Sequence, residues 1–128
     1  MPEIRILVLD DEPIVCKRLK PALEKCGYRV DLAATGQEAI ERLDEERYSI
    51  VITDVRMEGI DGLEVLKHAR ERSPTTIVIM ITGYATVEVA RQALTLGAFD
   101  FIAKPFKIDD LRAVVARAVS KLEAAPAR

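Results

Sequence analysis

The sequence predicts an α/β domain in which five parallel strands form a doubly wound (βα)5 sheet with helices on both faces. Five short apolar runs rich in β-branched residues are typical of strands buried on both faces. The stretches between them repeat apolar residues every three or four positions, as amphipathic helices do. Right-handed crossovers then place helices on both faces. We expect the 128 residues to form one domain, with a core at 4–122 and a tail or linker at 124–128.

The five candidate strands differ in the strength of their pattern. The run at 4–9 is almost wholly aliphatic, and the run at 77–81 is aliphatic throughout. The aliphatic run at 50–52 ends in Thr53 and Asp54, the run at 99–103 ends in Lys104 and Pro105, and the run at 30–34 is weaker. The segments between these runs are each long enough for one helix and two short connections, which favours strictly alternating strands and helices.

The first helix is expected to follow the first strand closely. Its apolar residues recur on one face from Val15 to Cys26, and Gly27 stands where a helix would end. Cys16 and Cys26 then lie in the same helix, almost three turns apart. We therefore expect no disulfide between them, because that separation is too long for an S–S bond.

Capping residues mark the next two helices. Thr35 and Glu38 form a capping box before an apolar stretch, and Asp61 can cap a third helix. The fourth and fifth helices are expected at 86–96 and 108–122, where apolar residues again fall on one face.

Composition excludes several classes of function. With 19 basic and 21 acidic residues, the chain has a net charge of −2 and lacks the excess of basic residues typical of proteins that bind nucleic acid or an anionic membrane. No apolar run reaches the roughly 18 residues that span a bilayer. The N-terminal residues do not have the basic start and apolar stretch of a signal peptide, so we expect none. His68 is the only histidine and no CxxC occurs, so we expect a solvated helix residue rather than a zinc ligand or a base. We expect a cytoplasmic protein.

Polar residues follow four of the five strands. The carboxyl ends of the strands lie at one edge of a doubly wound sheet, where such folds place their sites. We therefore expect three carboxylates, one hydroxyl and one ammonium group to lie close together. The residues are Asp10 and Asp11 after the first strand, Asp54 at the end of the third, Thr82 at the end of the fourth and Lys104 after the fifth.

This combination of groups favours phosphoryl transfer to an aspartate. Three carboxylates in one crevice repel each other, and a hard divalent cation such as Mg²⁺ relieves that repulsion. A cation, a lysine and a hydroxyl together can surround a tetrahedral dianion, while a carboxylate among them acts as the nucleophile. One Asp at a strand end is more often a helix cap or a turn residue, but that reading does not explain both Asp54 and Lys104.

Other phosphate chemistries fit less well. A dinucleotide, flavin or P-loop site needs a turn rich in glycine or hydroxyl residues after the first strand, but this turn reads Asp-Asp-Glu-Pro. A phosphatase with an aspartyl nucleophile requires a second Asp two residues after the first. Glu12 and Pro13 stand at those positions.

Six segments together resemble one known family, the receiver domain of bacterial two-component response regulators. The resemblance extends from Ile4 to Leu122. It implies a flavodoxin-like fold with strand order 2-1-3-4-5, an order that we take from the family and not from the sequence pattern. The segments are 7–12 (LVLDDE), 51–57 (VITDVRM), 61–62 (DG), 80–83 (MITG), 97–101 (GAFDF) and 104–106 (KPF).

The resemblance implies roles for the acidic residues. Asp54 would be the phosphoacceptor and would take a phosphoryl group from a sensor histidine kinase. Asp11 and Asp54 would bind Mg²⁺ directly, together with the backbone carbonyl of Arg56, and Asp10 would act through a metal-bound water. The domain would assist its own phosphorylation and dephosphorylation without being an enzyme for a separate substrate.

The resemblance also implies a switch. Thr82 and Lys104 would hold the phosphoryl oxygens, and Phe101 would turn inward when Thr82 moves toward the phosphate. The surface of the fourth helix, fifth strand and fifth helix would then change to control an output partner, and this face is a candidate for homodimerisation. The bond between Lys104 and Pro105 resembles the cis peptide of the family.

Some features depart from the family pattern or leave alternatives open. Glu58 stands where the family commonly has proline, and it adds a negative charge to the loop. By the resemblance, Arg56 and Tyr84 would flank the approach of water to the phosphate, and we therefore expect slow self-dephosphorylation. The segment at 82–90 is similar to receivers of ATPase-linked transcriptional activators or of hybrid kinases. A protein that acts alone and an excised receiver both stay open, as does a phosphorylation-independent interaction domain of the same fold.

Overall fold

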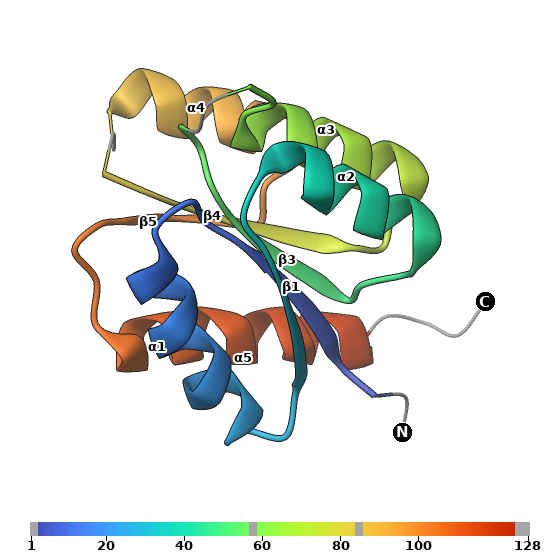
Figure 1. The fold of residues 1–128 in the computed structure, drawn as a ribbon, viewed down its shortest axis with the longest axis vertical. Helices are drawn as coiled ribbons and strands as arrows, with labels where there is room; N and C mark the ends of the chain where they lie inside the picture. Colours follow the sequence, from blue (N-terminus) through green and yellow to red (C-terminus); the bar gives the residue numbers. More distant parts are fainter. Residues whose placement is uncertain (1–2, 57–58, 84–85, 125–128) are drawn as a thin grey trace.

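The computed structural model describes residues 3–56, 59–83 and 86–124. Strands and helices alternate along the chain, and the five strands form one parallel sheet in the order β2-β1-β3-β4-β5 (Figure 1). The predicted doubly wound fold and strand order are confirmed. The strands are β1 (Arg5–Leu9), β2 (Arg29–Ala33), β3 (Ile50–Asp54), β4 (Ile77–Thr82) and β5 (Asp100–Ala103). The helices are α1 (Pro13–Glu24), α2 (Gly36–Glu45), α3 (Gly62–Arg72), α4 (Val87–Thr95) and α5 (Ile108–Ala124).

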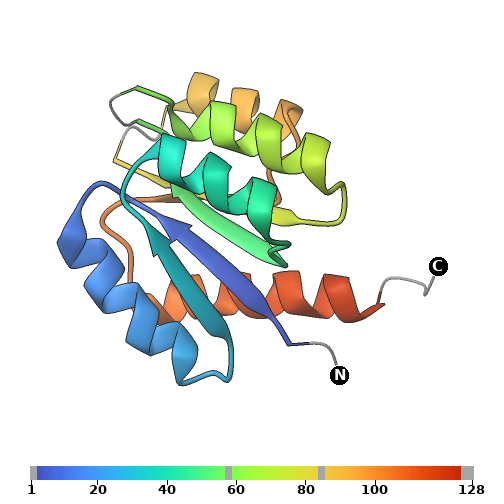
Figure 2. The same ribbon diagram turned by 45° about the vertical axis from the view of Figure 1, so that its right-hand side comes forward.

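The helices divide between the two faces of the sheet. Figures 1 and 2 show α1 and α5 on one face and α2, α3 and α4 on the other. β3 contributes side chains to both apolar cores. Ile50 and Ile52 pack on the side of α1 and α5, while Val51 packs on the opposite side. Burial on both faces explains why the central strands are continuous apolar runs.

The parallel register aligns the carboxyl ends of the central strands. Leu9, the last residue of β1, pairs with Thr53 of β3. Thr82, the last residue of β4, pairs with Ala103 of β5. The residues that follow these positions therefore meet at a single edge of the sheet.

The first helix ends earlier than the sequence predicts. α1 stops at Glu24, so the expectation that Cys16 and Cys26 share one helix is wrong. Gly27 has a left-handed φ of 92° and its N–H donates to the Glu24 carbonyl at 2.9 Å, which closes the helix while the apolar spacing still continues. Both cysteines are free thiols, Cys16 buried and Cys26 exposed.

Two predicted helix starts are confirmed by their hydrogen bonds. Thr35 Oγ1 accepts from the backbone N–H of Glu38 at 3.1 Å, and Asp61 Oδ1 accepts from the N–H of Glu64 at 3.0 Å. His68 lies on α3, where its partly covered ring contacts Asp44 at 2.7 Å. Over the described part of the chain, no helix is both long enough and apolar enough to cross a membrane.

Candidate functional site

The Lys104 ammonium group lies at the centre of a cluster of three carboxylates. Its Nζ is 2.9 Å from Asp10 Oδ2, 2.7 Å from Glu12 Oε1 and 2.8 Å from Asp54 Oδ2. The Asp10 and Asp54 side chains are almost wholly buried, whereas that of Glu12 is 55% exposed. The cluster therefore has two fixed acidic members and one that borders solvent.

Backbone groups hold the two buried carboxylates in place. Asp10 Oδ1 accepts from the N–H of Glu12 at 2.8 Å, and Asp54 Oδ1 accepts from the N–H of Arg56 at 3.2 Å. Each carboxylate thus has one oxygen bound to the chain just after its strand and the other facing Lys104. The bond from the Lys104 N–H to the Thr82 carbonyl, 2.8 Å long, joins the ends of β5 and β4.

Thr82 and Phe101 lie beside this cluster. Thr82 is fully buried at the last position of β4, one register step from Lys104. Phe101 is half-buried in β5, pairs with Met80 and packs on the core beneath α2, α3 and α4. The peptide bond between Lys104 and Pro105 is cis, which confirms that expectation.

Burial and charge act in opposite directions on these groups. Burial raises the pKa of Asp10, and the nearby Lys104 ammonium only partly offsets that effect. Burial alone would lower the pKa of Lys104, but its hydrogen bonds to Asp54 and Glu12 and its ion pair with Asp10 outweigh burial and raise it. Lys104 therefore keeps its positive charge at neutral pH, and its ammonium group contacts all three carboxylates.

The carboxylates fit a hard divalent cation. Asp10, Glu12 and Asp54 each offer an oxygen within 4.8 Å of the other two. Within the described residues, Asp10 Oδ2 is buried without a hydrogen bond of good geometry, and its close neighbour is the Lys104 ammonium. Carboxylate oxygens are ligands that Mg²⁺ prefers, so the donor set suits this ion.

The three clustered carboxylates differ in one member from the three expected at the metal site, which were those of Asp10, Asp11 and Asp54. Glu12 belongs to the cluster, whereas Asp11 is exposed and lies outside it. Glu12 could have been suspected from its position two residues after Asp10. It was not, because an acidic residue at the start of a helix is already explained by its favourable interaction with the helix dipole. Glu58 and Tyr84, for which roles were also expected, lie outside the described residues.

A parallel five-stranded sheet with buried aspartates and a lysine at its carboxyl edge defines a receiver-type signalling domain. The chain belongs to the response regulator receiver domain family, whose pattern matches residues 6–116. It is 38% identical over 117 residues to the transcriptional regulatory protein ZraR of Escherichia coli (strain K12), a match covering 91% of this chain and 26% of ZraR. The chain thus spans about a quarter of the length of that curated relative.

Solved structures show the same fold. A receiver domain protein from Methanospirillum hungatei superposes with a TM-score of 0.91 at 31% identity, covering 95% of this chain and 98% of that chain. A response regulator from Burkholderia pseudomallei, solved with a phosphorylated aspartic acid, a calcium ion and citrate, has a TM-score of 0.82 at 26% identity. That match covers 98% of this chain and 78% of the Burkholderia chain.

Proposed function

We propose that Asp54 accepts a phosphoryl group from a sensor histidine kinase in a Mg²⁺-dependent reaction. The observation that carries the proposal is the geometry of Asp54 Oδ2, a buried carboxylate oxygen at the sheet edge, 2.8 Å from the Lys104 ammonium. Membership of the receiver family supports it, as does the phosphorylated aspartic acid of the Burkholderia relative. The domain acts on itself and not on a separate substrate.

The proposed step transfers one phosphoryl group. An Asp54 carboxylate oxygen attacks phosphorus, a new P–O bond forms, and the P–N bond to the kinase histidine breaks, so that the imidazole leaves with the bonding pair. Lys104 balances the charge of the phosphoryl oxygens, and the Thr82 hydroxyl donates to one of them. No other group is consumed.

We further propose which groups hold the metal. Asp11, Asp54 and the Arg56 carbonyl bind Mg²⁺ directly, and Asp10 acts through a water. When bound, Mg²⁺ neutralises the negative charge that collects between carboxylates and phosphoryl oxygens. Burial of Asp10 and Asp54 supports this assignment, because buried carboxylates need a counter-charge.

The signal is proposed to leave through the face formed by α4, β5 and α5. Movement of Thr82 toward the phosphate draws Phe101 inward and changes this face. Val87 and Leu94, seven residues apart on α4, are 74% and 53% exposed, which supports homodimerisation there. Residues 1–128 would act as one receiver unit, and the output partner of a longer regulator would read the change.

Intact mass measurement tests the proposal. Incubation with Mg²⁺ and acetyl phosphate should add one phosphoryl group to the chain, and Asp54→Asn should abolish that gain. Asp110→Asn is a matched control, because Asp110 is exposed on α5 and the charge change is the same. A chain without any mass gain would instead favour a phosphorylation-independent interaction domain.

A further inference from the structure

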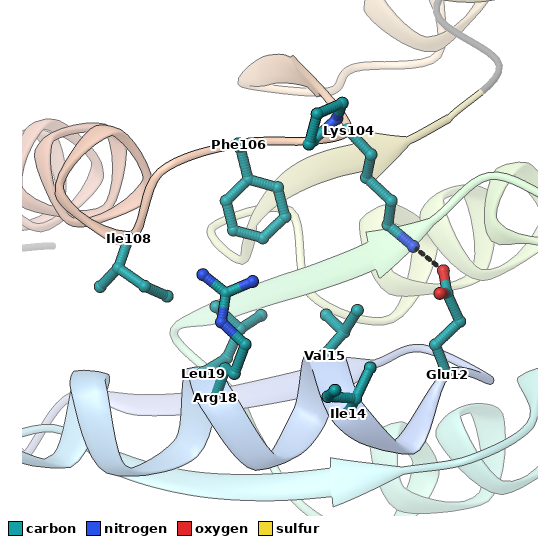
Figure 3. Close-up of a pocket in the computed structure, with 9 residues that line it drawn as sticks. Glu12, Ile14, Val15, Arg18, Leu19, Lys104, Phe106 and Ile108 are labelled. Carbon is teal, nitrogen blue, oxygen red and sulfur yellow. Dashed lines mark hydrogen bonds and ion pairs between the residues drawn. The ribbon is translucent and has the colours of Figure 1, made fainter.

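A groove lies between α1 and the segment after β5, and Glu12 of the carboxylate cluster lies at its border. Figure 3 shows Glu12 and Lys104 in contact at one end of this groove, whose volume is about 410 Å³. Val15, Leu19 and Phe106 provide apolar walls. The groove gives the Glu12 carboxylate room to move away from Lys104.

The three acidic partners of Lys104 are not equally fixed. Asp10 and Asp54 are buried and each accepts a backbone N–H. Glu12 is 55% exposed, and over the described chain its carboxylate has Lys104 as its one ion-pair partner. Releasing Glu12 into water therefore costs far less than releasing either aspartate.

We propose that Glu12 is a positioning residue that occupies Lys104 before phosphorylation and competes with the phosphoryl group for it. This inference rests on the proposed function of Asp54. Three carboxylate oxygens lie within 2.9 Å of Nζ: those of Glu12 and Asp54 accept hydrogen bonds from it, and that of Asp10 is in ion-pair contact. A phosphoryl oxygen that binds Lys104 competes with these carboxylates for the ammonium group, and Glu12, the exposed member, is the one that leaves. Its negative charge also repels an incoming phosphate dianion.

Glu12→Gln should speed the phosphorylation of Asp54. At saturating Mg²⁺ and low acetyl phosphate, we expect a rate increase of about two- to fivefold, the range of an exposed ion pair. Because the effect is electrostatic, it should shrink at about 1 M KCl, where the screening length is about 3 Å. Glu45→Gln, which removes the same charge from an exposed site at the end of α2, should leave the rate unchanged.

A second measurement needs neither phosphate nor metal. In Mg²⁺-free protein, ¹⁵N spectra should show slow hydrogen exchange of the Lys104 ammonium, and Glu12→Gln should accelerate that exchange. A purely structural role in starting α1 would leave this signal unchanged.

The two results separate the inference from the proposed function. If the unmodified chain gains no phosphoryl mass, the proposed function fails. If it gains that mass but Glu12→Gln is equally fast or slower, or if Lys104 exchange does not change, the competition by Glu12 is overturned.

Discussion

Lys104 balances two aspartates that have little access to water. Its side chain is 15% exposed, and those of Asp10 and Asp54 are 0% and 8% exposed. Removing the cation leaves two buried negative charges close together, which is far costlier than losing a surface ion pair.

Lys104→Met should therefore destabilise the metal-free protein by about 3 kcal/mol, and Mg²⁺ should restore part of that loss. Urea unfolding with and without Mg²⁺ measures both effects. Lys107→Met is the control, because Lys107 is exposed. Equal stability of Lys104→Met and the unmodified chain would show that the aspartates do not depend on this lysine.

Tyr48 and Asp31 form a second polar contact whose effect depends on pH. The Tyr48 hydroxyl donates to Asp31 Oδ2 at 2.7 Å, and this bond is the main cause that lowers the pKa of Asp31. A lowered pKa in the folded state stabilises the fold above the ordinary value of 3.8. That stabilisation is lost as the pH falls through the folded-state pKa.

Tyr48→Phe should raise the pKa of Asp31 and cost about 1 kcal/mol of unfolding free energy at pH 7. The difference in unfolding free energy from the unmodified chain should begin to narrow as the pH falls below 3.8, and it should be smallest below the lowered folded-state pKa, where Asp31 is protonated in both chains. NMR titration of Asp31 measures its pKa, and urea unfolding at pH 7 and below pH 3.8 measures the difference in unfolding free energy. Tyr28→Phe should not shift the Asp31 titration, and an unshifted Asp31 in Tyr48→Phe would contradict the account.

At the scale of elements, the start of α3 lies against the end of β3. The N–H of Gly62 donates to the Val55 carbonyl at 2.9 Å. A Cβ at position 62 would collide with the Asp54 carbonyl, so only glycine allows the helix to approach the end of β3 this closely.

Gly62→Ala should destabilise the fold by about 1–3 kcal/mol, the usual cost of overpacking. Thermal or urea unfolding measures this. Gly83→Ala is the control, because a Cβ there has no atom within 4 Å and the residue needs no positive φ. Similar losses in the two variants would mean that backbone freedom, and not the contact with Asp54, explains the glycine at position 62.

The sequence predicts the elements better than it predicts their ends. Strands buried on both faces must be short apolar runs, and side-chain caps leave a local signal, as at Thr35. The end of α1 was missed because the apolar spacing continues to Cys26, past the point where Gly27 closes the hydrogen-bond pattern. Periodicity reports which face is buried and not where hydrogen bonds stop.

The same reasoning explains which parts of the site could be predicted. Asp54 and Lys104 follow directly from the rule that strand ends meet at one edge of the sheet. Glu12 was missed because its partner is Lys104, 92 residues later, and a contact of that range has no local signature. Its exposed side chain reaches the cluster only because β1 and β5 are folded into the same sheet.

At the scale of the whole molecule, two apolar side chains on α4 mark the proposed dimer face. Leu94→Glu should weaken self-association of the phosphorylated chain by an order of magnitude or more, since it buries a charge in an apolar contact. Sedimentation analysis with Mg²⁺ and acetyl phosphate measures this. Ile14→Glu is the control, because it also replaces an exposed aliphatic side chain by glutamate. Ile14 is 66% exposed but lies on α1, so this change should leave self-association unchanged. Equal weakening by both would place the interface elsewhere.

The central claim is that Asp54 carries the phosphoryl group. Borohydride converts an aspartyl phosphate into homoserine, which marks the modified residue permanently. After treatment with Mg²⁺ and acetyl phosphate, reduction and peptide mapping should find homoserine at position 54, and none at position 10, 11 or 12. Homoserine at another acidic position, or its absence from a chain that has gained phosphoryl mass, would contradict the assignment of Asp54.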